Sequence, residues 1–378
     1  MALDIDERAA VIEVVREFAQ AELAPHALEW DAEKHFPIDT LERAGELGLG
    51  GIYASEEHGG TAMSRTDAVA VFEELAKGDV ALAAYISIHN MVVWMIDAFG
   101  SDELRAEWVP RLATLQERAS YCLTEPGAGS DAASLRTAAR RDGDDFLLTG
   151  TKQFISGAGS SAAYIVMART GEPGAHGISA FVVPGDAPGL AFGPNERKMG
   201  WNTQPTRQVI LDGVRVPATS ILGAEGDGFR IAMRGLDGGR LNMAACSIGG
   251  AQWTLDRAVA YVREREAFGR PLAENQAVSF ALADAETKLQ AARGLVERAA
   301  EKLDANAPDK AVACAMAKRF ATDAAFEVAN EALQLHGGYG YLHEYGIEKV
   351  VRDLRVHQIL EGTNEIMRLI IARSMLEA

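Results

Sequence analysis

The sequence predicts an α+β protein of three consecutive domains, in the order helical, β and helical. Two observations predict this order: where the prolines lie, and how the spacing of apolar residues changes along the chain. Seven of the twelve prolines lie between residues 126 and 217, and proline breaks helix interiors because it lacks a backbone donor. Apolar spacing changes near residues 120 and 226. We therefore expect domains at 1–120, 121–225 and 226–378.

Each segment has its own local pattern. Residues 7–22 and 66–77 carry apolar residues at three- and four-residue spacing, which predicts amphipathic helices. The middle segment has short β-branched and aromatic runs between turn residues, which predict strands: DFLLTGTKQFISG, AAYIVMART, GISAFVVP and RQVILDGVRVP. Long stretches rich in Ala, Leu and Glu follow residue 226 and predict a helical bundle: 229–265, 274–304, 309–336 and 363–377.

Composition and charge limit the classes of function. With 48% hydrophobic and 24% charged residues, the 378-residue chain has the composition of a soluble globular protein. Its formal net charge of −17 argues against a nucleic-acid backbone or an anionic membrane as the main partner. The most apolar run, from Ala81 to Gly100, is interrupted by His89, Asn90 and Asp97. It is therefore expected to be a core helix and not a membrane span.

The cysteines and the N-terminal residues predict an intracellular location. Cys122, Cys246 and Cys314 are odd in number and far apart, and they lack the C-x-x-C spacing of a zinc site. We expect no disulfide framework and no metal. The first residues, MALDIDERAAVIEVVREF, are acidic and read as an amphipathic helix, not as a signal or transit peptide. The expected location is the cytoplasm.

Two glycine-containing segments are candidates for ligand contact. In YCLTEPGAGSDAASL (121–135), Gly127 and Gly129 permit a loop whose exposed N–H groups could hold a polar cofactor edge, or a plain tight turn. No Gly-Lys-Ser/Thr follows, so the loop is not a P-loop. LQLHGGYGY (333–341) predicts a helix end at Gly337. It holds more glycine than a cap needs, so backbone approach to a ligand or a second subunit is the alternative.

Four single residues or pairs have an ordinary structural interpretation and a functional one. Phe154 is either a core aromatic or a cover for a planar ring, and Arg265 is either a solvated charge or an anion clamp. Asp237 and Arg240 lie at i and i+3 and read as a weak surface ion pair. The two glycines between them each cost a helix roughly 1 kcal/mol relative to alanine, which suggests that space is needed there. Glu361 would complement a helix dipole.

Together these motifs resemble the acyl-CoA dehydrogenase family over essentially the whole chain. The strongest markers, in order, are YCLTEPGAGSDA, FISGAG, REREAFGRPLAENQ, LQLHGGYGYL and ILEGTNEIMRLIIAR. The resemblance implies an N-terminal α-helical domain, a middle β-barrel and a C-terminal four-helix bundle. Four further segments look most similar to the branch of the family that oxidises isobutyryl-CoA in valine catabolism: SYCLTEPGAGSDAASL, GWNTQPTRQVI, RGLDGGRLNMAACSIGGAQ and VRDLRVHQILEGTNEIMR.

The family resemblance implies a base, Glu361, in the EGT motif. Some relatives carry the base immediately before the residue matching Arg240, but that position is Gly239 here, so Glu361 is the only candidate at either position. The implied reaction removes the acyl α-proton while a hydride passes from the β-carbon to flavin N5. The product is a trans-2-enoyl thioester. Exclusion of water is expected to raise the pKa of Glu361 and make it a stronger base.

The resemblance also implies FAD and acyl-CoA sites. The flavin is expected beside Tyr121, Cys122, Leu123, Thr124, Glu125, Pro126, Gly127, Ala128, Gly129 and Ser130, and beside Phe154, Ile155 and Ser156. Thr363, Asn364 and Glu365 match the turn after the base. The pyrophosphate and adenosine are expected, across a subunit interface, at Arg265, Asn275, Gln276, Gln334, Leu335, His336, Gly337 and Gly338. Acyl-CoA is expected at Ser130, Asp237, Gly238, Gly239, Arg240 and Arg373.

The implied partners are an electron-transfer flavoprotein as acceptor and three further copies of the chain, in a dimer of dimers. A 2-methylbutyryl or short straight-chain acyl-CoA is the alternative substrate. An acyl-CoA oxidase would use the same base but reduce oxygen, and its chain usually has further C-terminal helices. A non-catalytic acyl-CoA-binding protein would lack the base or the flavin motifs, and both are present here.

Overall fold

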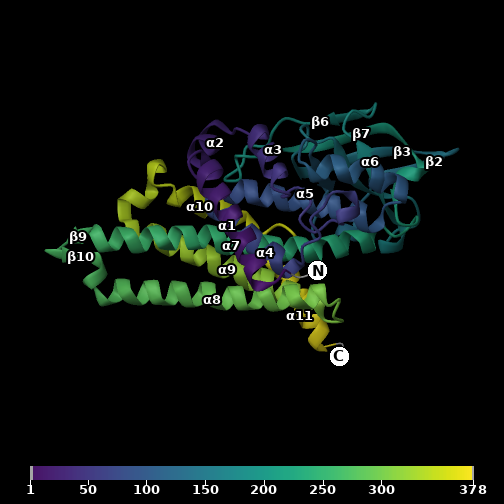
Figure 1. Ribbon diagram of the computed structural model, residues 1–378. Coiled ribbons are helices and arrows are strands. Elements are labelled where there is room, and N and C mark those ends of the chain that lie inside the picture. The colour runs from purple at the N-terminus through teal and green to yellow at the C-terminus, as the bar shows by residue number, and fades with distance from the viewer. Residues whose placement is uncertain (1–2, 377–378) are drawn as a thin grey trace.

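The computed structural model describes residues 3–376 and has the predicted order of a helical part, a β part and a second helical part (Figure 1). The N-terminal part contains α1 (Ile5–Phe18), a π-helical turn (Ala19–Leu23), α2 (Ala27–Glu33), α3 (Ile38–Glu46), α4 (Arg65–Gly78), α5 (Val80–Phe99) and α6 (Asp102–Ala113). The C-terminal part contains α7 (Gly228–Glu264), the hairpin β9 (Glu266–Ala267) and β10 (Arg270–Pro271), α8 (Gln276–Asp304), α9 (Lys310–His336), α10 (Ile347–Arg355) and α11 (Asn364–Leu376). The expected domain order is confirmed.

The middle part is one mixed sheet of eight strands. Its strands are β1 (Ala119–Cys122), β2 (Ala138–Asp142), β3 (Asp145–Ser156), β4 (Ala163–Arg169), β5 (Ile178–Pro184), β6 (Leu190–Phe192), β7 (Thr206–Pro217) and β8 (Ile221–Leu222). They follow the order β6-β7-β3-β2-β4-β5-β8, and β1 pairs in parallel with β4. No ladder joins β6 to β8 within residues 3–376, so the predicted barrel is incompletely closed.

The first helices begin where the sequence offers side-chain caps. Asp4 and Glu7 form a capping box at the start of α1, and Ser64 accepts a bond from the third residue of α4. Asp79 does the same for α5. α5 is long and apolar enough to cross a membrane, but 83% of its apolar window is buried inside the protein. The prediction of a core helix is confirmed.

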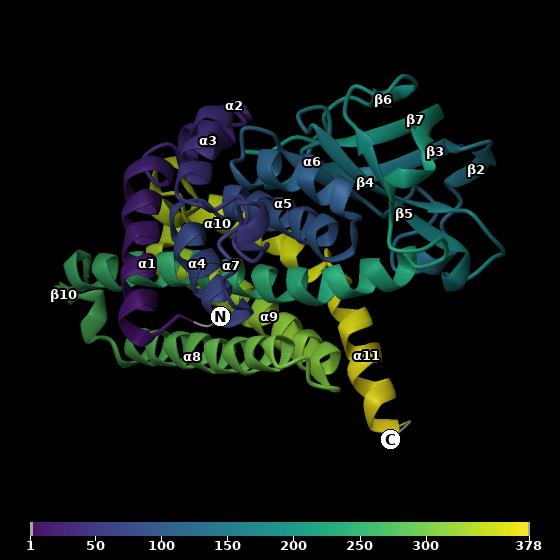
Figure 2. The same ribbon diagram turned by 45° about the vertical axis from the view of Figure 1, so that its right-hand side comes forward.

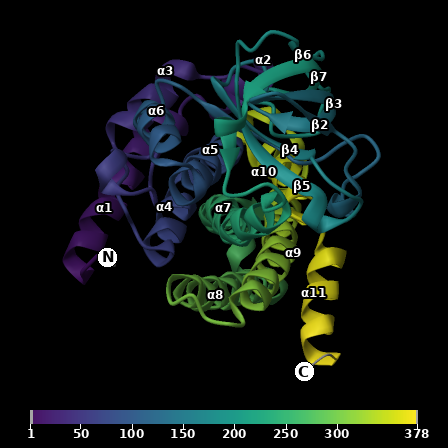
Figure 3. The ribbon, with the colours of Figure 1, turned by 90° about the vertical axis from the view of Figure 1, so that its right-hand side faces the viewer.

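α7 is the central helix, and it packs against α4, α5, α8 and α9. Its small residues allow close approach: a Cβ atom at Gly249 would lie 2.1 Å from the Glu73 carbonyl oxygen on α4, and one at Gly250 would lie 2.5 Å from a Val80 methyl. Viewed along the bundle, the sheet covers α5 and one side of α7, and α9 and α8 lie on the other side (Figure 3). α11 extends away from the rest of the chain (Figure 2).

A buried ion network joins the three parts of the chain. The Lys349 ammonium on α10 donates to Asp79 at the start of α5 (2.9 Å) and to Asp353 (2.8 Å), and Asp353 also accepts from the backbone N–H of Trp201 in the β part. Each charge has a partner, as buried charges require. The network fixes α10, and hence the segment that follows α10, against the other two parts.

Candidate active site

Glu361 lies in a short turn between α10 and α11. The turn is anchored by the buried His357, whose Nε2 accepts from the Trp201 indole N–H (3.2 Å) and whose Nδ1 bonds the Ser247 hydroxyl (2.7 Å). Glu361 and Gly362 both have left-handed backbones, with φ of 56° and 88°. A left-handed conformation is unfavourable for a glutamate, so surrounding contacts must hold it.

The Glu361 carboxylate lies directly over Gly239 of α7. A Cβ atom at Gly239 would stand 2.6 Å from Glu361 Oε2, closer than real Cβ contacts allow. Oε2 is buried and has no hydrogen-bond partner within residues 3–376, although the residue as a whole is partly exposed. Glycine at position 239 therefore makes room for this carboxylate, which confirms the prediction that space is needed there.

Burial dominates the electrostatics of Glu361. It raises the pKa of the Glu361 carboxyl to about 7, while the positive charges of Arg240 and Lys318 act in the opposite direction. Within residues 3–376 the carboxylate accepts no hydrogen bond from the first turn of α11, where the exposed Glu365 bonds Arg368. The backbone turns the carboxylate toward α7, so no contact within residues 3–376 supports a dipole-complementing role for Glu361.

Asp237 and Arg240 form a buried ion pair and not a surface one. Arg240 Nη1 donates to Asp237 Oδ1 (2.8 Å), and the two side chains are only 5% and 10% exposed. Arg240 Nε also donates to the backbone carbonyl of Glu361 (3.2 Å). Because the helix face carrying this pair is covered by the 361–363 turn and by α9, the expectation of a weak surface pair is wrong. The pair instead helps to hold the turn.

Several polar groups beside Glu361 were not identified from the sequence. Arg65 of α4 lies 3.5 Å over the ring of Tyr53, whose hydroxyl accepts from the Asn242 amide (3.2 Å). A Cβ atom at Gly238 would stand 2.5 Å from Arg65 Nη1. These residues come from three distant segments, and no spacing in the sequence connects them.

Lys318 of α9 was also not identified from the sequence, although the apolar periodicity of α9 points to it. It is fully buried, and its ammonium donates to the carbonyl of Gly362 (2.8 Å) and to the side-chain oxygen of Asn364 (2.9 Å). In the sequence it falls in phase with Cys314, Ala321 and the other small buried residues of α9. A lysine on the apolar face of a helix is rare unless it is paired or functional.

The two predicted flavin segments lie side by side. The backbone N–H of Gln153 donates to the Thr124 carbonyl (2.8 Å), which joins the 123–130 loop to β3. Glu125 and Ala128 exchange backbone hydrogen bonds, so the loop does contain a tight turn. Glu125 in turn pairs with the fully buried Lys152 (2.8 Å). The loop is thus a rigid edge beside the strand.

Phe154 fits a planar ligand better than a core position. Its side chain is 64% exposed and its φ is 60°, at the place where the β3–β7 register shifts. Nearby, the buried Tyr121 hydroxyl has no partner within residues 3–376. A flat cofactor with polar edges needs an aromatic face to stack on and a free hydrogen-bond donor. The exposed Phe154 ring and the unpaired Tyr121 hydroxyl offer these. The residues therefore fit FAD, and of the two interpretations of Phe154 the core aromatic is the wrong one.

Not every residue predicted beside the flavin exposes its side chain. Cys122 and Ile155 are buried in the core of the β part. Gly127 and Gly129 have no neighbour within 4 Å of an added Cβ, so this stretch of loop is open. Leu123 and Ala128 are buried on the side that faces α5.

The predicted adenosine and pyrophosphate residues lie at the other end of the bundle. Arg265 follows the last residue of α7, is exposed, and stands 5.6 Å from the ring of Tyr339. His336 is buried and stacks on Tyr261 (4.5 Å). Along α9, His336 lies roughly 27 Å from Lys318 at 1.5 Å per residue, and Figure 1 shows β9–β10 far from α11. One chain therefore does not bring the two groups of residues together.

The residues after Glu361 divide into anchors and exposed groups. Asn364 is buried and donates to Asp323 (2.7 Å), and the Thr363 hydroxyl accepts from the Ile366 N–H at the start of α11. Arg373 lies on the exposed part of α11, beyond the turn. The structure thus places Arg373 apart from the Glu361 cluster within one chain.

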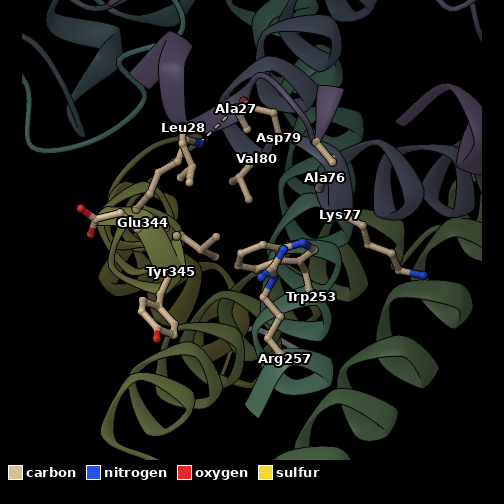
Figure 4. A pocket seen from close by; sticks show the side chains of 15 residues that line it. Ala27, Leu28, Ala76, Lys77, Asp79, Val80, Trp253, Arg257, Glu344 and Tyr345 are labelled. Atoms are coloured by element: carbon tan, nitrogen blue, oxygen red, sulfur yellow. Dashed lines mark hydrogen bonds and ion pairs between the residues drawn. The ribbon is translucent and has the colours of Figure 1, made fainter. Parts of the chain in front are cut away.

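A cavity of about 80 Å³ lies elsewhere, between α2, the α4–α5 junction, α7 and α10 (Figure 4). Figure 4 shows the Arg257 side chain extending to the ring of Trp253, and its guanidinium stands 4.1 Å from the ring centroid. Asp79 and Lys349 of the buried ion network also line it. None of the predicted site residues does, so this cavity is separate from the candidate active site.

Comparison with known proteins tests the family resemblance. Three family models match: "Acyl-CoA dehydrogenase, N-terminal domain" at residues 5–116, "Acyl-CoA dehydrogenase, middle domain" at 120–214, and "Acyl-CoA dehydrogenase, C-terminal domain" at 226–376. This chain belongs to the acyl-CoA dehydrogenase family. It is therefore an FAD-dependent oxidoreductase that acts on acyl-CoA. The expected fold, enzyme class and cofactor are confirmed, whereas the exact domain limits stay predictions.

Relatives within the acyl-CoA dehydrogenase family are close. The chain is 50% identical to "Isobutyryl-CoA dehydrogenase, mitochondrial" of Bos taurus (98% of this chain, 89% of the relative). It is 52% identical to the protein of that name from Dictyostelium discoideum (95% and 86%). Among solved structures, butyryl-CoA dehydrogenase from Megasphaera elsdenii superposes with a TM-score of 0.95 at 36% identity (99% and 98%). A chain from a structure of the electron transferring flavoprotein of Acidaminococcus fermentans gives 0.96 at 38% (100% and 99%).

Proposed function

We propose that this acyl-CoA dehydrogenase converts isobutyryl-CoA to methacrylyl-CoA, with Glu361 as the base that removes the α-proton. The observation that carries the role of Glu361 is the buried carboxylate over Gly239, with a raised pKa and an unpaired oxygen. An oxygen without a hydrogen-bond partner is free to accept a proton from a substrate. The choice of isobutyryl-CoA is supported by the two relatives of that name.

The turn that carries Glu361 offers a hydrogen-bond donor to the thioester oxygen as well as a base for the α-proton. Arg240 and Lys318 hold the carbonyls of Glu361 and Gly362, whereas the Glu361 N–H has no acceptor within residues 3–376. A free, preorganised N–H can bond the thioester oxygen and stabilise the negative charge that develops there when the α-proton leaves. One residue would thus supply both the base and an oxyanion donor.

The crowding beside Glu361 supports a short acyl group. Arg65, which lies over the Tyr53 ring, occupies the space along α7 next to Gly238, one residue from the glycine beneath the base. A chain extending past the α-carbon on this side would meet the Arg65 guanidinium. A short branched acyl group needs little of that space.

FAD would be held by the 123–130 loop, the exposed face of Phe154 and the backbone around Ser156. Bound there, FAD would supply the acceptor for the β-hydrogen as hydride. The chain's own residues would orient the acyl-CoA, exclude water and hold the proton on Glu361. The remaining flavin-site and CoA-site residues named from the sequence are part of this proposal.

The distance between the two predicted FAD regions supports a site shared between subunits, and so a homotetramer. Arg265, Gly337 and Gly338 would contact the pyrophosphate and adenosine of a neighbour's FAD. Exposed apolar side chains on the hairpin and on α11 agree with burial in an assembly: Phe268, Leu369, Met375 and Leu376. An electron-transfer flavoprotein is the proposed acceptor, and the cytoplasmic location stays a prediction.

Arg265→Ala is expected to weaken FAD retention roughly 10- to 100-fold and to loosen the assembly, because a charge-assisted bond to phosphate across an interface would be lost. Flavin absorbance and native mass after dialysis measure both effects. Arg263→Ala is the matched control, since Arg263 is exposed at the same end of α7 and lies outside the predicted site. An Arg265→Ala protein that stays yellow and keeps its mass would show Arg265 to be a solvated charge.

The substrate proposal is tested by anaerobic stopped-flow reduction of the flavin. Isobutyryl-CoA is expected to bleach the flavin at least about 10-fold faster than its straight-chain isomer butyryl-CoA or the longer 2-methylbutyryl-CoA, the discrimination that a fitted pocket permits for the placement or addition of one carbon. Transfer of the reduced enzyme to air with peroxide detection distinguishes a dehydrogenase from an oxidase. If butyryl-CoA reacts equally fast, the isobutyryl assignment is wrong while the family membership stands.

A further inference from the structure

Lys318 is a buried lysine that forms no ion pair within 4.0 Å in residues 3–376. It is fully buried, and its two hydrogen-bond acceptors, the Gly362 carbonyl and the Asn364 side-chain oxygen, are both neutral. The other two buried lysines in residues 3–376 differ: Lys152 pairs with Glu125 at 2.8 Å, and Lys349 pairs with two aspartates at 2.9 and 2.8 Å. A buried unpaired charge is costly. A methionine would fill the same place on α9 without that cost.

The charge that offsets Lys318 is the Glu361 carboxylate. Burial lowers the pKa of the Lys318 ammonium to about 8, and Glu361 is the strongest group acting against that decrease. The charged or titratable groups around the turn are Asp237 and Arg240 from α7, Arg319 and Asp323 from α9, Glu365 and Arg368 from α11, Arg65 from α4, Tyr53, and Tyr121 from β1. Of these, only Arg240 joins Lys318 in favouring the ionised form of Glu361.

Lys318 also acts on the backbone of the turn. Glu361 and Gly362 are consecutive left-handed residues. Arg240 holds the carbonyl of the first, and Lys318 holds the carbonyl of the second. Lys318 further bonds Asn364, which fixes the start of α11 through Thr322 and Asp323. Two cations on two successive carbonyls set the direction of the Glu361 side chain and leave its N–H free.

We propose that Lys318 is a positioning residue for the dehydrogenation: it holds the Glu361 turn and keeps the base ionised at neutral pH by its charge. This inference rests on the proposed role of Glu361. The sign of its effect follows from the charge. Removing a cation beside a carboxylate makes ionisation harder, so the base becomes active only at higher pH.

The first test is the pH dependence of flavin reduction by isobutyryl-CoA in Lys318→Met and Lys318→Gln. The wild-type rate is expected to rise with a midpoint near pH 7. In both variants the midpoint is expected to move upward by about one unit or more, so the loss of rate is largest at low pH. Lys318→Gln can still donate to the Gly362 carbonyl and separates charge from hydrogen bonding. A folded variant with an unmoved midpoint overturns the proposal.

Lys198→Met is the matched control for removing a lysine. The Lys198 ammonium also donates to neutral acceptors, the Gln204 carbonyl (2.7 Å) and the Thr206 hydroxyl (2.8 Å), and it lies outside the proposed site. Its removal is expected to lower the unfolding temperature and leave the midpoint in place. An equal shift in Lys198→Met would show that loss of stability, and not loss of the local charge, moves the midpoint.

The second test needs no catalysis. In a double-mutant cycle at pH 7.5, between the pKa of Glu361 (about 7) and that of Lys318 (about 8), Lys318→Met is expected to lower the unfolding temperature more in the Glu361 protein than in the Glu361→Gln protein, because only in the former does Lys318 face a carboxylate. At pH 5.5, where Glu361 is protonated, the two losses are expected to be equal. A purely structural lysine predicts equal losses at both pH values, and that result would overturn the proposal.

The outcomes distinguish this inference from the function it rests on. If Glu361→Gln reduces its flavin at the wild-type rate, Glu361 is not the base and both proposals fail. If Glu361→Gln is inactive while the Lys318 variants show the wild-type midpoint and no coupling, only the role of Lys318 fails. If Lys318→Met alone does not fold, the same substitution is made in the Glu361→Gln protein, where a smaller loss of stability is expected.

Discussion

Glu361→Gln is expected to reduce its flavin at least about 100-fold more slowly than wild type, the lower end for loss of a positioned general base. Glutamine keeps the size of the side chain but cannot accept a proton at neutral pH. The carboxylate Oε2 is buried and unpaired over Gly239, so FAD content and acyl-CoA affinity are expected to survive. The measurement is the stopped-flow rate at saturating isobutyryl-CoA.

Stability distinguishes a base from a dipole-complementing acid at Glu361. The folded-state pKa of about 7 lies above the ordinary value, so ionising Glu361 costs stability as pH rises toward and through pH 7. Above pH 7, Glu361→Gln is therefore expected to unfold at the wild-type temperature or higher. A dipole role predicts a loss of roughly 0.3–1 kcal/mol instead. Glu103→Gln, at an exposed first helical turn, is the control for such a loss.

Moving the base to position 239 is expected to restore part of the activity that Glu361→Gly removes. A side chain grown from Gly239 enters the space of the Glu361 carboxylate, since its Cβ would lie 2.6 Å from Oε2. With Glu361→Gly that space is vacant. Adding Gly239→Glu is then expected to raise the rate of flavin reduction at least about 10-fold over Glu361→Gly alone, because a general base is again within reach.

Gly239→Gln in the Glu361→Gly background is the matched control for the transferred base. It fills the same space without a base, so no recovery is expected. Recovery by glutamine equal to that by glutamate would contradict the assignment, because the vacant space and not the missing base would then explain the loss. Gly239→Glu with Glu361 retained is expected to be impaired, since two carboxylates would occupy one site.

Local patterns anticipated most of the secondary structure. The stretches 229–265, 274–304 and 309–336 correspond to α7, α8 and α9, whose bounds lie within two residues of those expected. The four β-branched runs became β3, β4, β5 and β7. Helical and strand periodicity depend on near neighbours, so they can be read from short windows. The nine-residue α10 was missed because a short helix between glycine-rich and turn segments gives too little periodicity.

By itself the sequence determined the order of the three parts, the family, the cofactor and the choice of Glu361 over Gly239 as candidate base, because each depends on residue types and their spacing. Only the tertiary structure decided what surrounds the base. It showed that Asp237 and Arg240 are buried, that Phe154 is exposed, and that Lys318 bonds a turn 44 residues away. Burial and charge at the site arise from the contacts between α7, α9 and the 361–363 turn. These contacts join residues far apart in the sequence, so they cannot be predicted from the spacing of residues along the chain.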